Sequence, residues 1–320
     1  MTALIPVDDP QLTRPAQYPA DRHPALVYLA SLSPTGRRSS QGRLRQVANL
    51  LGHDDFNTVP WHRLRYQHVA AIRSRLQELG KAPATINATL YALRGVTRAA
   101  FNLELIGADD YQRIRAVKPV RGRRLPAGRA LSPGELKALL DDCMADHGPA
   151  GVRDAAVIGL LYGAGLRRAE IVMLEEANYA PDSGELRVMG KGNKERLVYV
   201  DGGAAEALKD WLLVRGEDPG PLFVPINKGG VLRMQQLTDQ AVYNMLRKRA
   251  GQAAVDPVSP HDLRRSFISD LLDAGADIST ASQLAGHASV QTTARYDRRD
   301  EKAKKKAVGL LHIPYRRRET

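Results

Sequence analysis

Six side chains in this sequence have types and an order that suit chemistry on a phosphodiester. In chain order they are Arg167, Lys191, His261, Arg264, His287 and Tyr296. Arginine and lysine bind phosphate oxygens, histidine moves protons near neutral pH, and a tyrosine hydroxyl can act as a nucleophile. No residue spacing typical of a metal site accompanies them, so we expect a reaction without metal ion or cofactor. Each residue alone has an ordinary structural explanation, and the prediction rests on their order and spacing together.

Arg167 follows the segment Gly163 to Gly165, which ends a helix predicted for residues 153–162. The glycines permit a sharp bend, so Arg167 can begin a new helix that faces a groove. Glu170 lies three residues later on the same helical face and can brace the arginine. This position favours a supporting role for Glu170 rather than direct chemistry. A plain surface arginine is the alternative interpretation of Arg167.

Lys191 lies in a glycine-rich turn, Gly190 to Asn193, between strands predicted for residues 185–189 and 196–200. Glycines let the backbone approach a ligand closely, so the lysine can reach DNA and give a proton to a departing oxygen. The turn is not a P-loop, because no Ser or Thr follows the lysine. An ordinary lysine-rich hairpin turn is the alternative, and Lys194 is a neighbouring candidate for contact with DNA.

His261 and Arg264 stand three residues apart at the start of a predicted helix, 261–274, and therefore share a face. Leu263 and Phe267 define the buried face of this helix, which places Arg264 near its edge. Joint use of the pair on one phosphate is the functional interpretation, and a capping or packing histidine is the alternative.

His287 follows Gly286, which ends a predicted helix from Ile278 to Ala285, and Tyr296 stands nine residues further on. We expect Tyr296 in a short helical stretch that begins near Ser289. A loop histidine bonded to backbone and a half-buried packing tyrosine are the alternatives.

Composition narrows the class of protein. The chain has 320 residues, 43% of them hydrophobic, which is enough for two domains with sizeable cores. Lys and Arg number 47 against 35 Asp and Glu, a net charge of +12 that favours a polyanionic partner. A membrane surface would also attract this charge, but no apolar run of about 18 residues is present to span a bilayer. With Cys143 as the single cysteine and no signal peptide at the N-terminus, we expect a cytoplasmic, nucleoid-associated protein.

The hydrophobic pattern predicts a mainly α-helical protein with one small antiparallel β-sheet, divided into two domains. Val69, Ile72, Leu76 and Leu79 repeat at helical spacing in the first domain, and Ile86, Leu90, Leu93 and Val96 form a second apolar stripe. Between the domains, the segment from Tyr111 to Pro133 has no acidic residue and several arginines, and we expect it to lie against DNA phosphates rather than in a core. The expected divisions are a flexible arm at 1–22, a helical domain at 23–110, a basic linker at 111–130, a second domain at 131–296 and a tail at 297–320.

These features together resemble the tyrosine recombinase family, the lambda-integrase and Xer-type enzymes, over nearly the whole chain. The similarity is carried by five motifs in the family's order. They are Gly165-Leu166-Arg167-Arg168-Ala169-Glu170, Gly190-Lys191-Gly192-Asn193-Lys194-Glu195-Arg196, His261-Asp262-Leu263-Arg264, Leu284-Ala285-Gly286-His287, and Thr292-Thr293-Ala294-Arg295-Tyr296. The fourth motif departs from the family's Leu-Gly-His by the insertion of Ala285. The resemblance implies a helical core-binding (SAM-like) domain followed by a catalytic domain.

The resemblance also implies a site-specific recombinase that breaks and rejoins DNA without ATP, through a 3′-phosphotyrosyl intermediate and a Holliday junction. Arg167, Arg264 and His287 would bind the phosphate, Tyr296 would attack it, His261 would assist as a base, and Lys191 would protonate the leaving oxygen. Glu170 would brace the site. The predicted contacts with DNA backbone are Arg121, Arg123, Arg124 and Lys194.

The expected partners are double-stranded DNA and three further copies of the chain, in a tetramer on two DNA sites. An apolar patch at 308–313 lies between basic runs of the tail, which favours docking of the tail on a neighbouring protomer over a solvated basic tail. Two alternatives to a recombinase are considered. A type IB topoisomerase-like enzyme would relax DNA without site preference, and a catalytically silent regulator would bind DNA without cleaving it.

Overall fold

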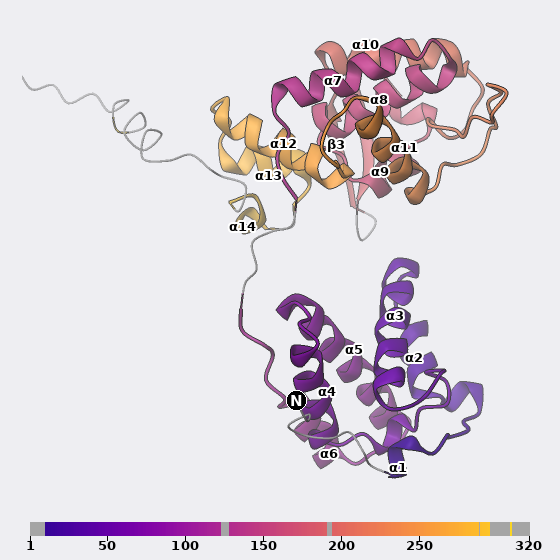
Figure 1. The fold of residues 1–320 in the computed structure, drawn as a ribbon, viewed down its shortest axis with the longest axis vertical. Helices are drawn as coiled ribbons and strands as arrows, with labels where there is room; N and C mark the ends of the chain where they lie inside the picture. Colours follow the sequence, from indigo (N-terminus) through magenta and orange to yellow (C-terminus); the bar gives the residue numbers. More distant parts are fainter. Residues whose placement is uncertain (1–9, 123–127, 191–193, 288, 295–307, 309–320) are drawn as a thin grey trace, which may run out of the picture. The chain divides into compact units, whose positions relative to one another are not determined.

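The computed structural model describes residues 10–122, 128–190, 194–287, 289–294 and 308. The chain divides into two compact units, residues 1–126 and residues 127–320, and each is described by itself. The described elements are mainly helices, with one small sheet in the second unit (Figure 1). This is the expected fold class. Among the described residues, no helix is both long and apolar enough to cross a bilayer.

The first unit is a helical bundle organised around α5 (Pro83–Asn102), which packs against α2, α3, α4 and α6. The predicted stripe on α5 is buried, with Leu90, Leu93 and Val96 at most 1% exposed. The remaining described helices of this unit are α1 (Pro10–Thr13), α2 (Pro24–Ala30), α3 (Pro34–Leu50), α4 (Tyr66–Glu78) and α6 (Ala108–Arg115), with short 3-10 turns at Ala20–Arg22 and Trp61–Arg63.

Two segments expected to lie outside a packed domain contribute to the core of this unit. Residues 1–22 are predicted as a flexible arm, yet Leu12 in α1 is fully buried. Residues 111–130 are predicted as a linker, yet α6 continues to Arg115, and Ile114 and Val117 are 0% and 3% exposed. Single apolar residues among arginines and prolines are enough to attach both segments, and the surrounding charge hides that signal in the sequence.

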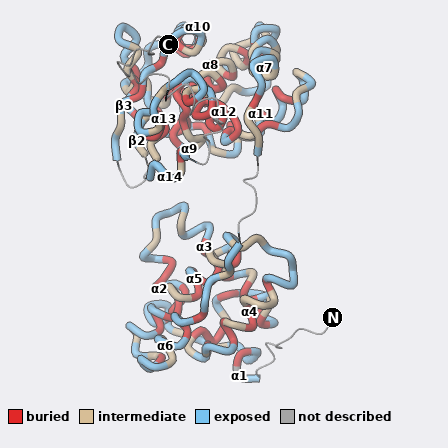
Figure 2. Tube along the Cα trace, turned by 90° about the vertical axis from the view of Figure 1, so that its left-hand side faces the viewer, coloured by how far each residue is buried: buried red, intermediate tan, exposed pale blue. Residues whose placement is uncertain are grey.

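The second unit is built around α8 (Pro149–Gly163), which packs against α7 (Pro133–Ala145), α10 (Gly202–Arg215), α11 (Asp239–Gln252) and α12 (Pro260–Asp273). A capping box opens α7, where Ser132 Oγ accepts from Glu135 N at 3.3 Å and Glu135 Oε2 accepts from Ser132 N at 2.9 Å. α12 is buried along most of its length and appears largely red in Figure 2. Gly275 follows α12 with φ +100°, as a C-terminal glycine should, whereas Gly251 lies inside α11 and does not cap it.

The sheet has the strand order β1-β2-β3 and is antiparallel throughout. Its strands are β1 (Tyr179–Ala180), β2 (Glu185–Gly190) and β3 (Lys194–Tyr199). Leu186 pairs with Val198 on the buried face, and Gly190 pairs with Lys194 at the end of the hairpin. The other described helices of this unit are short, namely α9 (Arg168–Met173), α13 (Ile278–Ala285) and α14 (Val290–Thr293), with a 3-10 turn at Glu176–Asn178.

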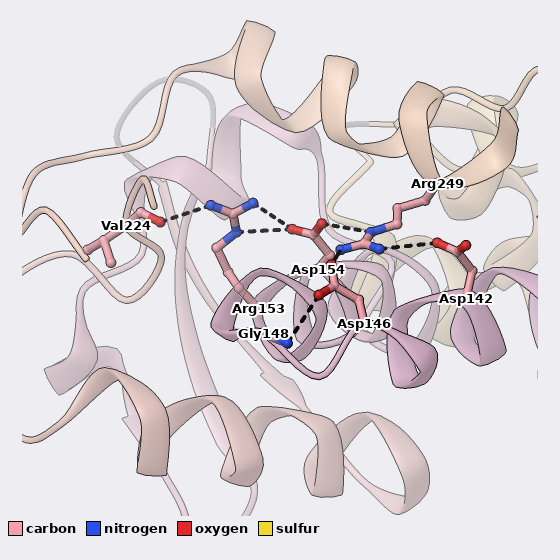
Figure 3. Close-up of polar contacts among 7 residues, drawn as sticks. All are labelled: Asp142, Asp146, Gly148, Arg153, Asp154, Val224 and Arg249. Atoms are coloured by element: carbon pink, nitrogen blue, oxygen red, sulfur yellow. Dashed lines mark hydrogen bonds and ion pairs between the residues drawn. The ribbon is translucent and has the colours of Figure 1, made fainter. Parts of the chain in front are cut away.

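A buried ionic network joins three of these helices. The guanidinium of Arg249 on α11 is 1% exposed and donates to three carboxylates, Asp154 at 2.9 Å, Asp142 at 3.2 Å and Asp146 at 2.6 Å (Figure 3). Arg153 also donates to Asp154, at 2.6 Å. The network therefore fixes α11 against α7 and α8, the helices that support the elements of the candidate site.

Candidate active site

Arg167 stands at the N-cap of α9 and is held by Glu170, one turn into that helix. Glu170 Oε2 accepts from the backbone N–H of Arg167 at 2.8 Å, and Glu170 Oε1 accepts from its Nη1 at 2.7 Å. The Gly163–Gly165 break precedes this turn, as the sequence predicts. The brace expected of Glu170 is therefore present, and it leaves the guanidinium of Arg167 partly exposed, at 37%.

Glu170 is itself buried, and a second arginine completes its environment. Arg196 on β3 donates through Nη1 and Nη2 to the two carboxylate oxygens, both at 2.9 Å. Burial opposes ionisation of Glu170, but the hydrogen bonds from Arg196 and Arg167 outweigh it and lower the pKa of the carboxyl to about 2. The carboxylate is thus ionised at neutral pH and joins α9 to the hairpin.

Arg264 on α12 is only 2% exposed, deeper than the edge position that the sequence predicts. Its guanidinium donates to two backbone oxygens, Nη1 to Gly165 O and Nη2 to Ala285 O. Gly165 lies in the segment between α8 and α9, and Ala285 is the last residue of α13, so one side chain binds both parts of the chain. Gly165 has φ +60°, and a Cβ there would lie 2.2 Å from the ring of Phe267, so only glycine fits this close approach.

The turn at Gly286 holds the second arginine beside the first. Gly286 ends α13 with φ +60°, and its carbonyl oxygen accepts from Arg167 Nη2 at 2.7 Å. Consecutive carbonyls, of Ala285 and Gly286, therefore bind Arg264 and Arg167. A Cβ on Gly286 would lie 2.9 Å from the guanidinium of Arg196, which packs against this turn. The structure thus brings three sequence motifs to one place through backbone contacts.

The two candidate histidines border this arginine pair. The Nδ1 atom of His287 is 2.8 Å from Thr293 Oγ1 on α14. Burial, and then the charges of Arg264 and Arg167, lower the pKa of His287 to about 4. Partial burial, followed by the charges of Arg265 and Arg264, also lowers the pKa of His261. Both imidazoles are therefore mainly neutral at pH 7, a form that can accept a proton or donate a hydrogen bond.

A cavity of about 400 Å³ opens where Arg167, His261 and Arg264 meet. Three candidate residues lie in its wall, and the two arginines among them suit an anionic group. The other lining residues are Arg168, Ala169, Asp239, Tyr243, Ser259 and Pro260.

The remaining predicted site residues are distributed differently. Lys194 begins β3 and is exposed. Arg121 belongs to the first unit, where it borders a recess of about 450 Å³ together with Arg73, Lys118 and Pro119. Four predicted residues lie outside the described part of the chain, namely Lys191, Tyr296, Arg123 and Arg124.

Two residues of the site were not predicted as functional. Arg196 is the last residue of the hairpin motif, and its pairing with Glu170 requires knowledge of how β3 lies against α9. Thr293 precedes Tyr296 by three residues, and only the turn between α13 and α14 reveals its contact with His287.

Replacing Glu170 with glutamine should lower the free energy of unfolding at pH 7 by about 3 kcal/mol, because the lowered pKa of this buried carboxyl measures the strength of its pairing. The folded-state pKa of about 2 lies below the ordinary value of 4.5, so this contribution is present above about pH 4.5 and is lost as the pH falls toward 2. Urea denaturation of both proteins at pH 7 and near pH 3 measures it. An equal difference in stability at the two pH values would contradict the assignment.

Comparison with known proteins is consistent with this arrangement. Residues 129–303, more than half of the chain, match the Phage integrase family. The chain is 33% identical over 284 residues to the tyrosine recombinase XerC of Alcanivorax borkumensis, covering 86% of this chain and 88% of the relative. Motifs, fold and relatives thus define the class, a DNA breaking-and-rejoining enzyme.

Solved structures share the fold at low sequence identity. The integrase of transposon Tn1549, in complex with transposon right end DNA, matches with a TM-score of 0.64 at 16% identity, covering 90% of this chain and 99% of that one. XerH bound to palindromic difH substrate matches with a TM-score of 0.61 at 21% identity, covering 89% and 79%. The chain belongs to the phage integrase family of tyrosine recombinases, and it is an enzyme of site-specific DNA recombination.

Proposed function

We propose that this recombinase cleaves DNA by attack of Tyr296 on a phosphodiester held by Arg167 and Arg264. The observation that carries the proposal is the arrangement of these two arginines on the consecutive carbonyls of Ala285 and Gly286, beside a cavity that both arginines line. Fixed guanidinium donors stabilise the charge that builds on the non-bridging oxygens in the five-coordinate transition state. Because backbone oxygens hold both side chains in advance, little reorganisation is needed during the reaction.

The proton movements of the proposed reaction balance. The Tyr296 oxygen forms a bond to phosphorus while the bond from phosphorus to the 5′-oxygen breaks. A phenol has an ordinary pKa near 10, so it needs a base, and neutral His261 accepts its proton. Lys191 gives a proton to the leaving 5′-oxygen. The product is a 3′-phosphotyrosyl link, and a 5′-hydroxyl from a second duplex reverses these steps to rejoin the DNA.

His287 has a different role in this proposal. In the proposed tautomer, Nδ1 accepts from the hydroxyl of Thr293 at 2.8 Å, and the imidazole proton lies on Nε2, where it donates to a non-bridging oxygen. The low pKa of His287, about 4, keeps the ring in this neutral form. The contact with Thr293 supports this tautomer, because a hydroxyl can donate to an unprotonated Nδ1.

The proposed substrate is double-stranded DNA, as in the solved complexes of the Tn1549 integrase and XerH. The basic residues Arg121, Arg123, Arg124 and Lys194 contact the phosphate backbone, consistent with the net charge of +12. We place the reaction in the cytoplasm, on DNA of the nucleoid or of a mobile element.

The proposed assembly is a homotetramer on two recombination sites, in which strands are exchanged through a Holliday junction. Residues 297–320 dock on a neighbouring protomer through the apolar patch at 308–313. Val308 is described and is 66% exposed within the single chain, in keeping with a contact made only in the assembly.

Replacing Tyr296 with phenylalanine should leave DNA affinity unchanged and abolish the covalent complex on a nicked suicide substrate, because the attacking oxygen is removed. Tyr243→Phe is the matched control, since Tyr243 lines the cavity and carries the same hydroxyl. Denaturing gel electrophoresis detects the protein–DNA adduct. If Tyr296→Phe still forms the adduct while Tyr243→Phe does not, the assigned nucleophile is wrong.

A further inference from the structure

The short segment from Gly128 to Leu131, at the start of the second unit, is attached to the first turns of α12. The backbone N–H of Arg129 donates to Asp262 Oδ1 at 3.0 Å, and Arg265 Nη1 donates to Gly128 O at 3.0 Å. The N–H of Leu131 donates to the hydroxyl of Ser266 at 2.7 Å. We call residues 128–131 the anchor segment. Its contacts fall on the helix that carries His261 and Arg264.

Asp262 uses its two carboxylate oxygens for two different purposes. Oδ2 accepts from the backbone N–H of Ser259 at 2.9 Å and from its hydroxyl at 2.6 Å, which caps the start of α12. Oδ1 accepts from Arg129 N in the anchor segment. Capping alone needs only one oxygen, so it does not explain the second contact. Asp262 is 5% exposed, and it lies between the two candidate active-site residues of this helix.

Gly128 makes the close approach of the anchor segment possible. It has φ +95°, and a Cβ at this position would lie 2.2 Å from Asp262 Oδ1. Any larger residue must therefore displace either the segment or the carboxylate. Two side-chain contacts of Arg129 strengthen the attachment, one to Asp256 O at 3.1 Å and one to Glu135 Oε1 at 2.6 Å.

We propose that Asp262 is a positioning residue, which makes strand cleavage depend on the seating of the anchor segment against the first turn of α12. The proposal rests on the roles assigned above to His261 and Arg264. These residues flank Asp262 in the chain, so a shift of its carboxylate shifts the turn from which both side chains project.

Gly128→Ala tests the contact from the side of the anchor segment, in the full-length protein. We expect single-turnover cleavage of a suicide substrate to fall by about 10- to 100-fold, the cost of a small misplacement of reacting groups. Equilibrium DNA affinity should change little, since the charge of Asp262 remains, whereas the unfolding temperature should fall somewhat because an alanine at φ +95° is strained. Gly134→Ala is the matched control, because no atom lies within 4 Å of a Cβ added there.

Asp262→Asn tests the contact from the side of the helix, because an asparagine side chain offers one acceptor oxygen in place of two. The double variant Gly128→Ala/Asp262→Asn should cleave no more slowly than the slower single variant, since both changes break the same contact.

The dependence of the cleavage rate on pH distinguishes a positioning role of Asp262 from a general loss of structure. The charge of Asp262 raises the pKa of His261, while burial and the charges of Arg265, Arg264 and Arg167 lower it. Asp262→Asn should therefore lower the pKa of His261, so that the acid limb of the plot of cleavage rate against pH moves to lower pH. Gly128→Ala keeps the carboxylate and should leave that limb in place.

The proposal would be overturned if the fold-losses in cleavage rate of the two single variants multiplied in the double variant. It would also be overturned if Gly128→Ala cleaved DNA as fast as Gly134→Ala. An acid limb unmoved in Asp262→Asn would also count against it. If cleavage survives Arg264→Ala, the proposed function fails instead. If Arg264→Ala abolishes cleavage while Gly128→Ala has no effect, only the positioning role of Asp262 fails.

Discussion

Replacing Arg264 with alanine should slow single-turnover DNA cleavage by about 100- to 1,000-fold, the effect of removing one fixed donor from a transition-state oxyanion. The expected loss is large because the guanidinium is 2% exposed and already oriented by the carbonyls of Gly165 and Ala285. Arg264→Lys should recover little activity, since a single ammonium group cannot bind both carbonyls and a phosphate in the planar geometry of a guanidinium.

The same substitution leaves two buried carbonyl groups without their donor, so stability must be measured beside activity. Arg247→Ala removes an exposed arginine from α11 and provides the control for a change in net charge. We expect Arg264→Ala to bind DNA with an affinity close to that of Arg247→Ala while cleaving far more slowly. Cleavage within about threefold of the control would contradict a direct role in transition-state stabilisation.

Replacing Arg249 with leucine should lower the free energy of unfolding by about 3–5 kcal/mol, the usual cost of removing one partner from a buried ionic network. The change leaves Asp142, Asp146 and Asp154 close together without the cation that joins them (Figure 3). Urea denaturation at pH 7 measures the loss, and Arg247→Leu is the exposed control on the same helix. Equal stability of the two variants would show that the network makes no net contribution to the free energy of unfolding.

The pH dependence of the stability difference between wild type and Arg249→Leu shows whether charge pairing or packing causes it. The hydrogen bond from Arg249 lowers the pKa of Asp146. A lowered folded-state pKa gives stability that is present above the ordinary aspartate value of about 4 and is lost as the pH falls through the folded pKa. The gap between wild type and Arg249→Leu should therefore narrow below about pH 4. A gap that stays constant would assign the effect to packing of the long side chain instead.

Much of the fold could be predicted from local patterns. The stripe at Leu90, Leu93 and Val96 identifies α5, and the alternation around Leu186 identifies β2, because these residues face one core at regular spacing. The packing of residues 10–22 and 111–117 could not be predicted. There a few apolar residues, such as Leu12 and Ile114, attach a charged segment to helices distant in the sequence.

The order of the site residues could be predicted from the sequence, but the hydrogen bonds that hold their side chains could not. Arg264 and Arg167 are held by hydrogen bonds to backbone carbonyls, those of Gly165, Ala285 and Gly286. Because every residue type has a backbone carbonyl, the sequence does not indicate which ones act as acceptors. The same is true of Asp262, whose acidic side chain reads only as a helix cap until the anchor segment is seen against it. Tertiary contacts of this kind depend on where distant turns meet, which local periodicity does not specify.

Isolation of the covalent complex on a suicide substrate shows whether one tyrosine becomes bonded to a DNA end. Proteolysis of that complex, followed by mass spectrometry of the DNA-linked peptide, identifies the modified residue and the end of the DNA that it holds. We expect a peptide containing Tyr296, joined through its phenolic oxygen to a 3′-phosphate. A link to Tyr243 or any other residue, or to a 5′-phosphate, would contradict it.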